Sequence, residues 1–395
     1  MAKDWLAESI LTPEQEALRD AVSDIAQSFD REYWIEVNAA GRYPDEYVQA
    51  LTDGGWLSML IPEEYGGGGA SIEESALVLE TLNRWGGNAN TVHAQMYQMG
   101  AVLRHGNDEQ KRRWLPQIAN EGLRLQSFGV TEPDAGTDTT RIRTYAEKRG
   151  DKYIVNGGKI FTSRFQHTDL MLLLVRTKRY EEVERKTDGI TVLLVDTREA
   201  RNNGQIEHRQ IKVMAGGSDT NQLTFNDLEV PAENLIGEEG KGFRVIMSGM
   251  NAERISAASE YIGSGLYFID RATEYAKERE VFGRPIGMNQ GIQFPLASSF
   301  TELRAASVMR WQAARQFAAG SRDGFYANTC KYLAANALWN AANAAMDTFG
   351  GYGLASEYGI EQKFRSARAS LIAPISRNLI LAGIAHRDLG MPKSY

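Results

Sequence analysis

The spacing of apolar residues changes twice along this chain, and that change constrains the fold more than any single motif. From Thr12 to about Arg124, apolar residues recur at helical spacing. From about Leu125 to Gly237, short runs of β-forming residues replace them, at 153–155, 170–175, 190–195 and 223–225. From Gly242 onward the helical spacing returns.

We therefore predict a mainly α-helical protein with a central β domain. Residues 1–124 are expected to form an N-terminal helical domain, residues 125–236 a β-barrel-like middle domain, and residues 237–395 a C-terminal four-helix bundle. A length of 395 residues exceeds what one core usually organises, which agrees with several domains. The alanine-rich stretch at 304–346 allows close helix packing.

Local signals sharpen this outline. Thr12 and Pro13 predict a helix start, and the glycine-rich segment 62–69 predicts a loop. The pair at 150–151 predicts a turn between two strands. A stripe on the helix that follows Gly242 is expected to contain Phe243, Ile246, Met247 and Met250.

Charge and cysteine content narrow the function. Lys and Arg number 44 against 51 Asp and Glu, a net charge of −7, which argues against nucleic acid or an anionic membrane surface as partners. Cys330 is the lone cysteine, no apolar run is long enough to span a bilayer, and residues 1–5 do not resemble a secretion signal. We expect a cytoplasmic protein, and no spacing predicts a metal site.

Two segments of the predicted β domain carry the most specific signal. Residues 128–138 read Phe-Gly-Val-Thr-Glu-Pro-Asp-Ala-Gly-Thr-Asp, and residues 156–163 read Asn-Gly-Gly-Lys-Ile-Phe-Thr-Ser. They resemble the flavin-binding segments of the acyl-CoA dehydrogenase family. A flavin ring needs flat apolar cover and a few hydrogen-bond donors at its edge. By this resemblance the FAD ring is lined by Phe128, Val130, Thr131, Phe161 and Ser163, while Gly136 and Thr137 approach the cofactor or the substrate tail.

The C-terminal half carries two further matches. Residues 278–290 resemble the family segment that reaches FAD held mainly by a neighbouring subunit, and residues 347–353 resemble its glycine-rich turn. The resemblance implies cofactor contacts from Arg279, Phe282, Gln290, Asp347, Gly350 and Gly351, and from Ser376 and Asn378 near the flavin. An arginine suits a pyrophosphate because its planar fork donates two bonds at once. A homo-oligomer, expected to be a tetramer, follows from the shared site.

The family's usual catalytic glutamate has no counterpart at its expected place. Family spacing puts Pro374 there, and proline can neither accept a proton nor donate a backbone N–H. Glu253 instead matches the position of the base in the isovaleryl-CoA and long-chain acyl-CoA dehydrogenase branches. It shares a predicted helix face with Ile246, Met250 and Ala257, so its carboxylate interrupts an apolar stripe. It is either a desolvated base or half of a structural ion pair with an arginine.

The remaining candidates concern the substrate. The resemblance places Asn251 near the pantetheine of acyl-CoA, and Arg254 along the substrate tunnel or on a buried carboxylate. His93 is expected to be a core or tunnel residue rather than a catalyst. Three hypotheses follow. The first is α,β-dehydrogenation of an acyl-CoA thioester, with electrons passed to an electron-transfer flavoprotein. The second is another reaction on acyl-CoA, such as elimination, and the third is a flavin-loaded binding protein.

Overall fold

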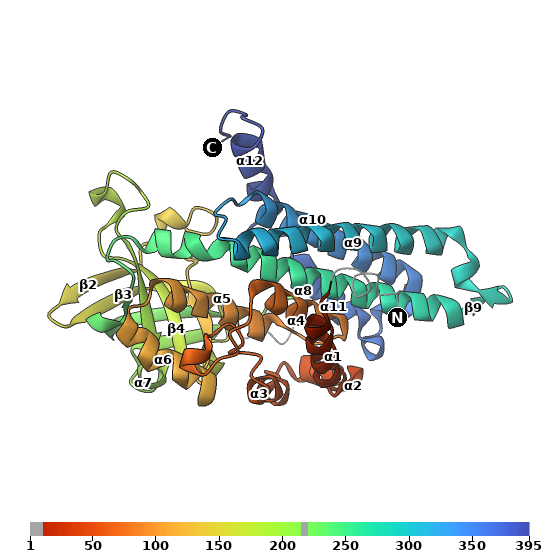
Figure 1. Ribbon diagram of the computed structural model, residues 1–395, viewed down its shortest axis with the longest axis horizontal. Helices are drawn as coiled ribbons and strands as arrows, with labels where there is room; N and C mark the ends of the chain where they lie inside the picture. The colour runs from red at the N-terminus through yellow and green to blue at the C-terminus, as the bar shows by residue number, and fades with distance from the viewer. Residues whose placement is uncertain (1–10, 215–219, 395) are drawn as a thin grey trace.

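The computed structural model describes residues 11–214 and 220–394. It places helices at both ends of the chain around one β domain, as predicted (Figure 1). The N-terminal residues in which we looked for a secretion signal lie outside the described part. Within the described ranges, none of the helices is both long and apolar enough to cross a membrane.

The first N-terminal helix begins where the sequence predicts. Thr12 caps this helix, with its hydroxyl accepting from the Gln15 N–H and the Gln15 side chain accepting from the Thr12 N–H. The segment at 62–69 is a loop with one short 3₁₀ turn. The helices are α1 (Pro13–Gln27), α2 (Arg31–Ala40), α3 (Asp45–Asp53), α4 (Ile72–Arg84), α5 (Asn90–His105) and α6 (Asp108–Asn120).

The β domain consists of one sheet in the described residues. Its strands run in the order β6-β7-β3-β2-β4-β5-β8, and β1 pairs in parallel with β4. The predicted turn at 150–151 joins β2 to β3. The elements are β1 (Leu125–Gly129), β2 (Tyr145–Arg149), β3 (Lys152–Ser163), β4 (Leu170–Arg176), β5 (Ile190–Asp196), α7 (Thr197–Asn202), β6 (Ile206–Gln210), β7 (Thr220–Pro231) and β8 (Leu235–Ile236).

Three long helices dominate the C-terminal part and pack side by side (Figure 1). Their shared core is rich in buried alanines, including Ala306, Ala334 and Ala341, which lets the helix axes approach closely. Helix α11 packs on α10, whereas α12 projects from the bundle (Figure 1). The elements are α8 (Gly242–Glu278), β9 (Glu280–Val281), β10 (Arg284–Pro285), α9 (Gln290–Ala318), α10 (Phe325–Phe349), α11 (Ile360–Ala369) and α12 (Arg377–Arg387).

One sequence expectation for α8 is wrong. We placed Met247 on the packed stripe, but its side chain is exposed, whereas Phe243 and Ile246 pack against the core beneath the sheet. At the N-terminal end of α8 only a narrow face meets the sheet and α5, and Met247 lies outside that face. The same end of α8 brings Glu253 against α5 and β1.

Candidate active site

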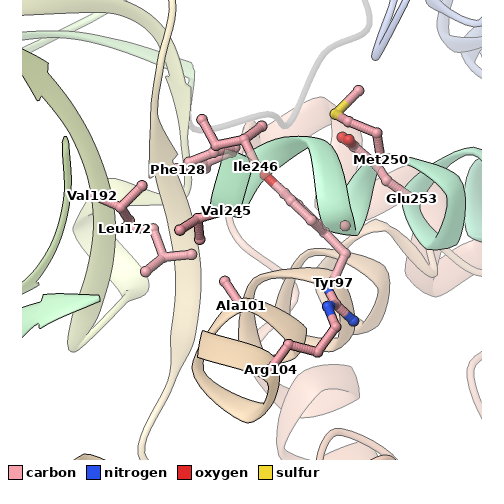
Figure 2. A pocket seen from close by; sticks show the side chains of 11 residues that line it. Tyr97, Ala101, Arg104, Phe128, Leu172, Val192, Val245, Ile246, Met250 and Glu253 are labelled. Carbon is pink, nitrogen blue, oxygen red and sulfur yellow. The ribbon is translucent and has the colours of Figure 1, made fainter. Parts of the chain in front are cut away.

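A small pocket lies where α5, the start of α8 and the sheet meet. It measures about 20 Å³, and Figure 2 shows Glu253 and Met250 on one side of it with Leu172 and Val192 on the other. Ile246, Met250 and Glu253 all line it, as their shared helix face predicts. Ala257 is buried one turn further along α8. A carboxylate therefore faces a largely apolar space.

Electrostatics distinguish Glu253 from a structural carboxylate. Burial raises the pKa of its side chain, and the charges of His93, Arg254 and Lys331 only partly oppose that effect. Among the described residues it makes neither an ion pair nor a hydrogen bond. The alternative of a salt bridge to an arginine is therefore not what the structure shows, although Arg254 follows it directly in sequence. A desolvated carboxylate without a partner is able to accept a proton.

Tyr97 and Arg104 of α5 complete the pocket, and we did not identify either from the sequence. Tyr97 reaches across from α5 and meets the Phe128 ring edge-on, with 5.6 Å between centroids (Figure 2). The Arg104 guanidinium packs closely against Gly100 and Gly249. A Cβ added to either glycine would come within 3.0 Å of a guanidinium nitrogen. Residues 93, 97, 101 and 104 share one face of α5 at helical spacing, which was the available signal.

The residues expected to line a flavin ring come together at the ends of β1 and β3. The Ile160 N–H donates to the Thr131 carbonyl at 2.8 Å, and the Ser127 hydroxyl donates to the Ser163 carbonyl at 2.7 Å. Phe161 has a positive φ of 58° and remains 59% exposed. An open aromatic face beside Thr131 and Ser163 fits the flat cover and polar edge that a flavin needs.

A buried ion pair connects the two segments that carry these flavin-lining residues. Lys159 Nζ donates to Glu132 Oε1 at 2.7 Å and to the Val130 carbonyl at 3.0 Å. Glu132 also accepts the N–H groups of Arg143 and Thr144, at 2.6 and 3.0 Å. Both charged residues belong to the two motifs of the β domain, but no local pattern indicates that they pair across the sheet. The turn that holds Gly136 and Thr137 is exposed, with open space around Gly136.

A second, larger cavity of about 810 Å³ lies at the other end of α8. It brings together five of the residues that we assigned to FAD from separate motifs: Arg279, Phe282, Asp347, Gly350 and Gly351. Nothing lies within 4 Å of a Cβ built on either glycine, and two arginine forks, of residues 279 and 284, line the cavity. An open glycine backbone with arginine donors fits the diphosphate half of FAD.

Other cofactor candidates are not brought into either cavity. Gln290 begins α9 beside the larger cavity without lining it. Ser376 caps α12 by accepting the Leu379 N–H, and Asn378 is exposed on the first turn of that helix. Pro374 lies in the connection from α11 to α12, where the preceding carbonyl, of Ala373, accepts the Tyr261 hydroxyl at 2.9 Å.

The two substrate candidates on α8 contact each other. Arg254 Nη1 donates to Asn251 Oδ1 at 3.2 Å, and Asn251 Nδ2 donates to the Asp323 carbonyl at 3.3 Å. Arg254 is buried, and burial lowers the pKa of its guanidinium. Both residues lie beside Glu253, and neither lines the small pocket. Among the described residues there is no cluster of three or more metal-ligating side chains.

Comparison with known families matches almost the whole chain. The N-terminal, middle and C-terminal domains of acyl-CoA dehydrogenase match residues 12–122, 127–228 and 240–377. The acyl-CoA dehydrogenase FadE12 of Mycobacterium tuberculosis is 34% identical over 391 residues, which is 98% of both chains. An acyl-CoA dehydrogenase of Bacillus subtilis is 31% identical over 364 residues, covering 92% of this chain and 94% of the relative.

Solved structures show the same similarity. Butyryl-CoA dehydrogenase from Megasphaera elsdenii superposes with a TM-score of 0.89 at 27% identity, covering 96% of this chain and 99% of that one. A glutaryl-coenzyme A dehydrogenase in complex with glutaryl-CoA gives a TM-score of 0.90 at 27% identity, with 97% of both chains covered.

Proposed function

The chain belongs to the acyl-CoA dehydrogenase family of FAD-dependent oxidoreductases, and we propose that Glu253 is its catalytic base. The reaction is α,β-dehydrogenation of an acyl-CoA thioester. When bound, FAD supplies the acceptor for the β-hydride. The observation that carries the assignment is a desolvated carboxylate without a partner, in a pocket beside the predicted flavin-lining residues.

Burial gives Glu253 the properties of a base for a weak carbon acid. A carboxylate in an apolar pocket binds a proton more strongly than one in water, which brings its proton affinity closer to that of a thioester α-carbon. Tyr97, Ile246 and Met250 line the pocket with it and limit its contact with water. The placement of the base on α8 agrees with the isovaleryl-CoA and long-chain acyl-CoA dehydrogenase branches, and it removes the need for an acid at position 374.

Two observations support a shared cofactor site in an oligomer. The small pocket and the large cavity lie at opposite ends of α8, and Glu253 and Tyr275 are 22 residues apart, roughly 33 Å of helix. Exposed apolar side chains line the large cavity, including Val281, Phe282 and Tyr352. We infer that one subunit supplies the ring site and its partner the diphosphate site. We propose a tetramer in which the projecting helix α12 also contacts a partner subunit. We further propose that electron-transfer flavoprotein is the electron acceptor.

Anaerobic flavin reduction tests the base. Wild-type enzyme is mixed with straight and branched saturated acyl-CoA thioesters, and the loss of flavin absorbance is followed by stopped flow. For Glu253→Gln we expect reduction at least about 100-fold slower, the low end for removing a general base. Glu239→Gln, an acid that accepts the Tyr153 hydroxyl outside the pocket, is the control and should be reduced at the wild-type rate.

Two outcomes contradict different parts of this proposal. If no saturated thioester bleaches the wild-type flavin, dehydrogenation is wrong. If Glu253→Gln is reduced as fast as wild type, only the base assignment is wrong. The shared cofactor site has a separate test: Arg279→Leu should release FAD, measured by flavin fluorescence, at concentrations at which wild type retains it. Retention by that variant would contradict the site.

A further inference from the structure

His93 and Glu260 form a buried ion pair that the proposed reaction does not yet use. His93 Nδ1 lies 2.9 Å from Glu260 Oε1 and joins α5 to α8. The two residues are 7% and 8% exposed. From the sequence we expected His93 to be a core or tunnel residue, and the structure adds a charged partner. Burying an ion pair is costly, so its place beside the candidate base calls for an explanation.

The imidazole makes only half of the hydrogen bonds that it could make. Nε2 of His93 is buried and has no hydrogen-bond partner among the described residues. Burial lowers the pKa of His93, but the charge and hydrogen bond of Glu260, together with the charge of Glu253, raise it above its ordinary value. The raised pKa favours the charged form of the ring, which contacts Glu260 through Nδ1 and leaves Nε2 unbonded.

Charged and titratable groups face the pair from several elements. His93 faces Glu253 and Glu260 on α8 and Arg164 just after β3. Tyr97, one turn along α5, lies 5.9 Å from the His93 ring and senses the charge of Glu253. Glu260 faces three further groups: Tyr47 on α3, Tyr261 on α8 and Lys363 on α11. Glu253 and Glu260 are the carboxylates that face this cation.

The helix geometry places the pair one to two helical turns from residues that line the pocket. Glu253 and Glu260 are seven residues apart on α8, about two turns and on one face. His93 and Tyr97 are one turn apart on α5, and Tyr97 lines the pocket with Glu253. His93 thus contacts the anion Glu260 directly and is also close enough to the candidate base Glu253 for that charge to raise its pKa.

We propose that His93 and Glu260 are positioning residues for the base: Glu260 holds His93 as a cation, and that cation keeps Glu253 ionised in a largely apolar pocket. This inference rests on the proposed function, because it assigns a role toward Glu253. Without the cation, a desolvated Glu253 takes up a proton at a higher pH and cannot accept another from the substrate. Without Glu260, burial favours a neutral His93, with the same consequence.

The pH dependence of flavin reduction separates this role from a purely structural one. The rate is measured at subsaturating acyl-CoA across the acid limb for wild type, His93→Gln, Glu260→Gln and the double variant. Each single variant should move the acid limb upward by roughly half to one pH unit. The double variant also lacks the cation, so its acid limb should be shifted about as far as that of Glu260→Gln and not by the sum of the two single shifts. His105→Gln is the matched control, since His105 also lies on α5 and bonds Ser248 on α8 at 2.7 Å, yet does not line the pocket.

A second measurement does not depend on activity. The chain has five histidines, so their ring carbons can be followed individually by NMR during a pH titration. His93 should titrate above the ordinary value of 6.5, and below its wild-type midpoint in Glu260→Gln. His105 should titrate below the ordinary value, because burial and the charges of Arg104 and Arg244 lower its pKa.

The outcomes distinguish this inference from the function beneath it. If the single variants lose stability but keep the wild-type acid limb, the pair is a structural clamp and the inference is wrong. The inference is equally wrong if His93 titrates below its ordinary value in wild type. Fast flavin reduction by Glu253→Gln would instead overturn the base assignment, whatever the histidine titration shows. If His93→Gln does not fold, the acid limb of Glu260→Gln and the NMR titration of His93 still test the inference.

Discussion

Two carboxylates with restricted access to water, Glu132 in the β domain and the half-buried Glu253 on α8, differ in how many of their hydrogen bonds the protein supplies. Glu132 is 8% exposed and accepts two backbone N–H groups and the Lys159 ammonium. Burial raises its pKa, but Lys159 and these hydrogen bonds bring it below the ordinary value. Glu253 has no such donors, and burial leaves its pKa raised.

The difference shows which buried acid is structural and which is available for chemistry. A fully bonded carboxylate holds neighbouring strands in register, and Glu132 with Lys159 fixes the segment that carries Val130 and Thr131. An unbonded carboxylate in a largely apolar pocket reduces stability, and it persists where function requires it. Substitutions at the two sites should therefore change stability in opposite directions.

The largest effect is expected for Lys159→Met. Removing the ammonium leaves Glu132 buried without its counter-charge, which should lower the free energy of unfolding by about 3–5 kcal/mol. Urea unfolding of FAD-loaded enzyme at fixed protein concentration measures this change. Lys152→Met on the same strand is the control, because the ion pair of Lys152 with Glu229 is exposed to solvent. This variant should unfold at the same urea concentration as wild type. Equal midpoints for the two variants would contradict the structural role of the Glu132 pair.

Sequence patterns located these residues without showing how they pair. The motifs at 128–138 and 156–163 contain both Glu132 and Lys159, and the periodicity placed Glu253 on an apolar helix face. The partner of Glu132 lies 27 residues away, and that of His93 lies 167 residues away. Such pairings depend on strand register and helix packing, which local patterns do not specify.

The order of helices and strands, by contrast, was predictable from local patterns. Changes of hydrophobic period follow from local backbone geometry, so the order of helices and strands was visible in the chain. Five FAD candidates from separate motifs meet in the larger cavity, but Tyr97, Arg104 and Glu260 were missed. The role of each of these three side chains depends on its contact with an element that is distant in sequence.

A smaller effect of opposite sign is expected for Glu253→Gln. The amide is close in size to the carboxylate but carries no charge to desolvate, so the variant should be more stable than wild type by roughly 0.5–2 kcal/mol at neutral pH. The same urea experiment measures it. A destabilised variant would show that Glu253 is satisfied in a way that resembles Glu132, and the contrast between the two sites would fail.

The smallest effect is the change of that stability difference with pH, and its sign follows from proton linkage. Because the pKa of Glu253 is raised in the folded state, the folded protein binds more protons than the unfolded chain above the ordinary value of 4.5. Its favourable contribution is present below 4.5 and is lost as pH rises through the folded pKa, so the advantage of Glu253→Gln over wild type should grow from pH 4.5 toward neutral.

Glu132 has a lowered pKa, so the advantage of wild type over Glu132→Gln should shrink as pH falls below 4.5. Melting temperatures of the three proteins across this range test both signs, and parallel curves would mean that neither carboxylate titrates differently on folding.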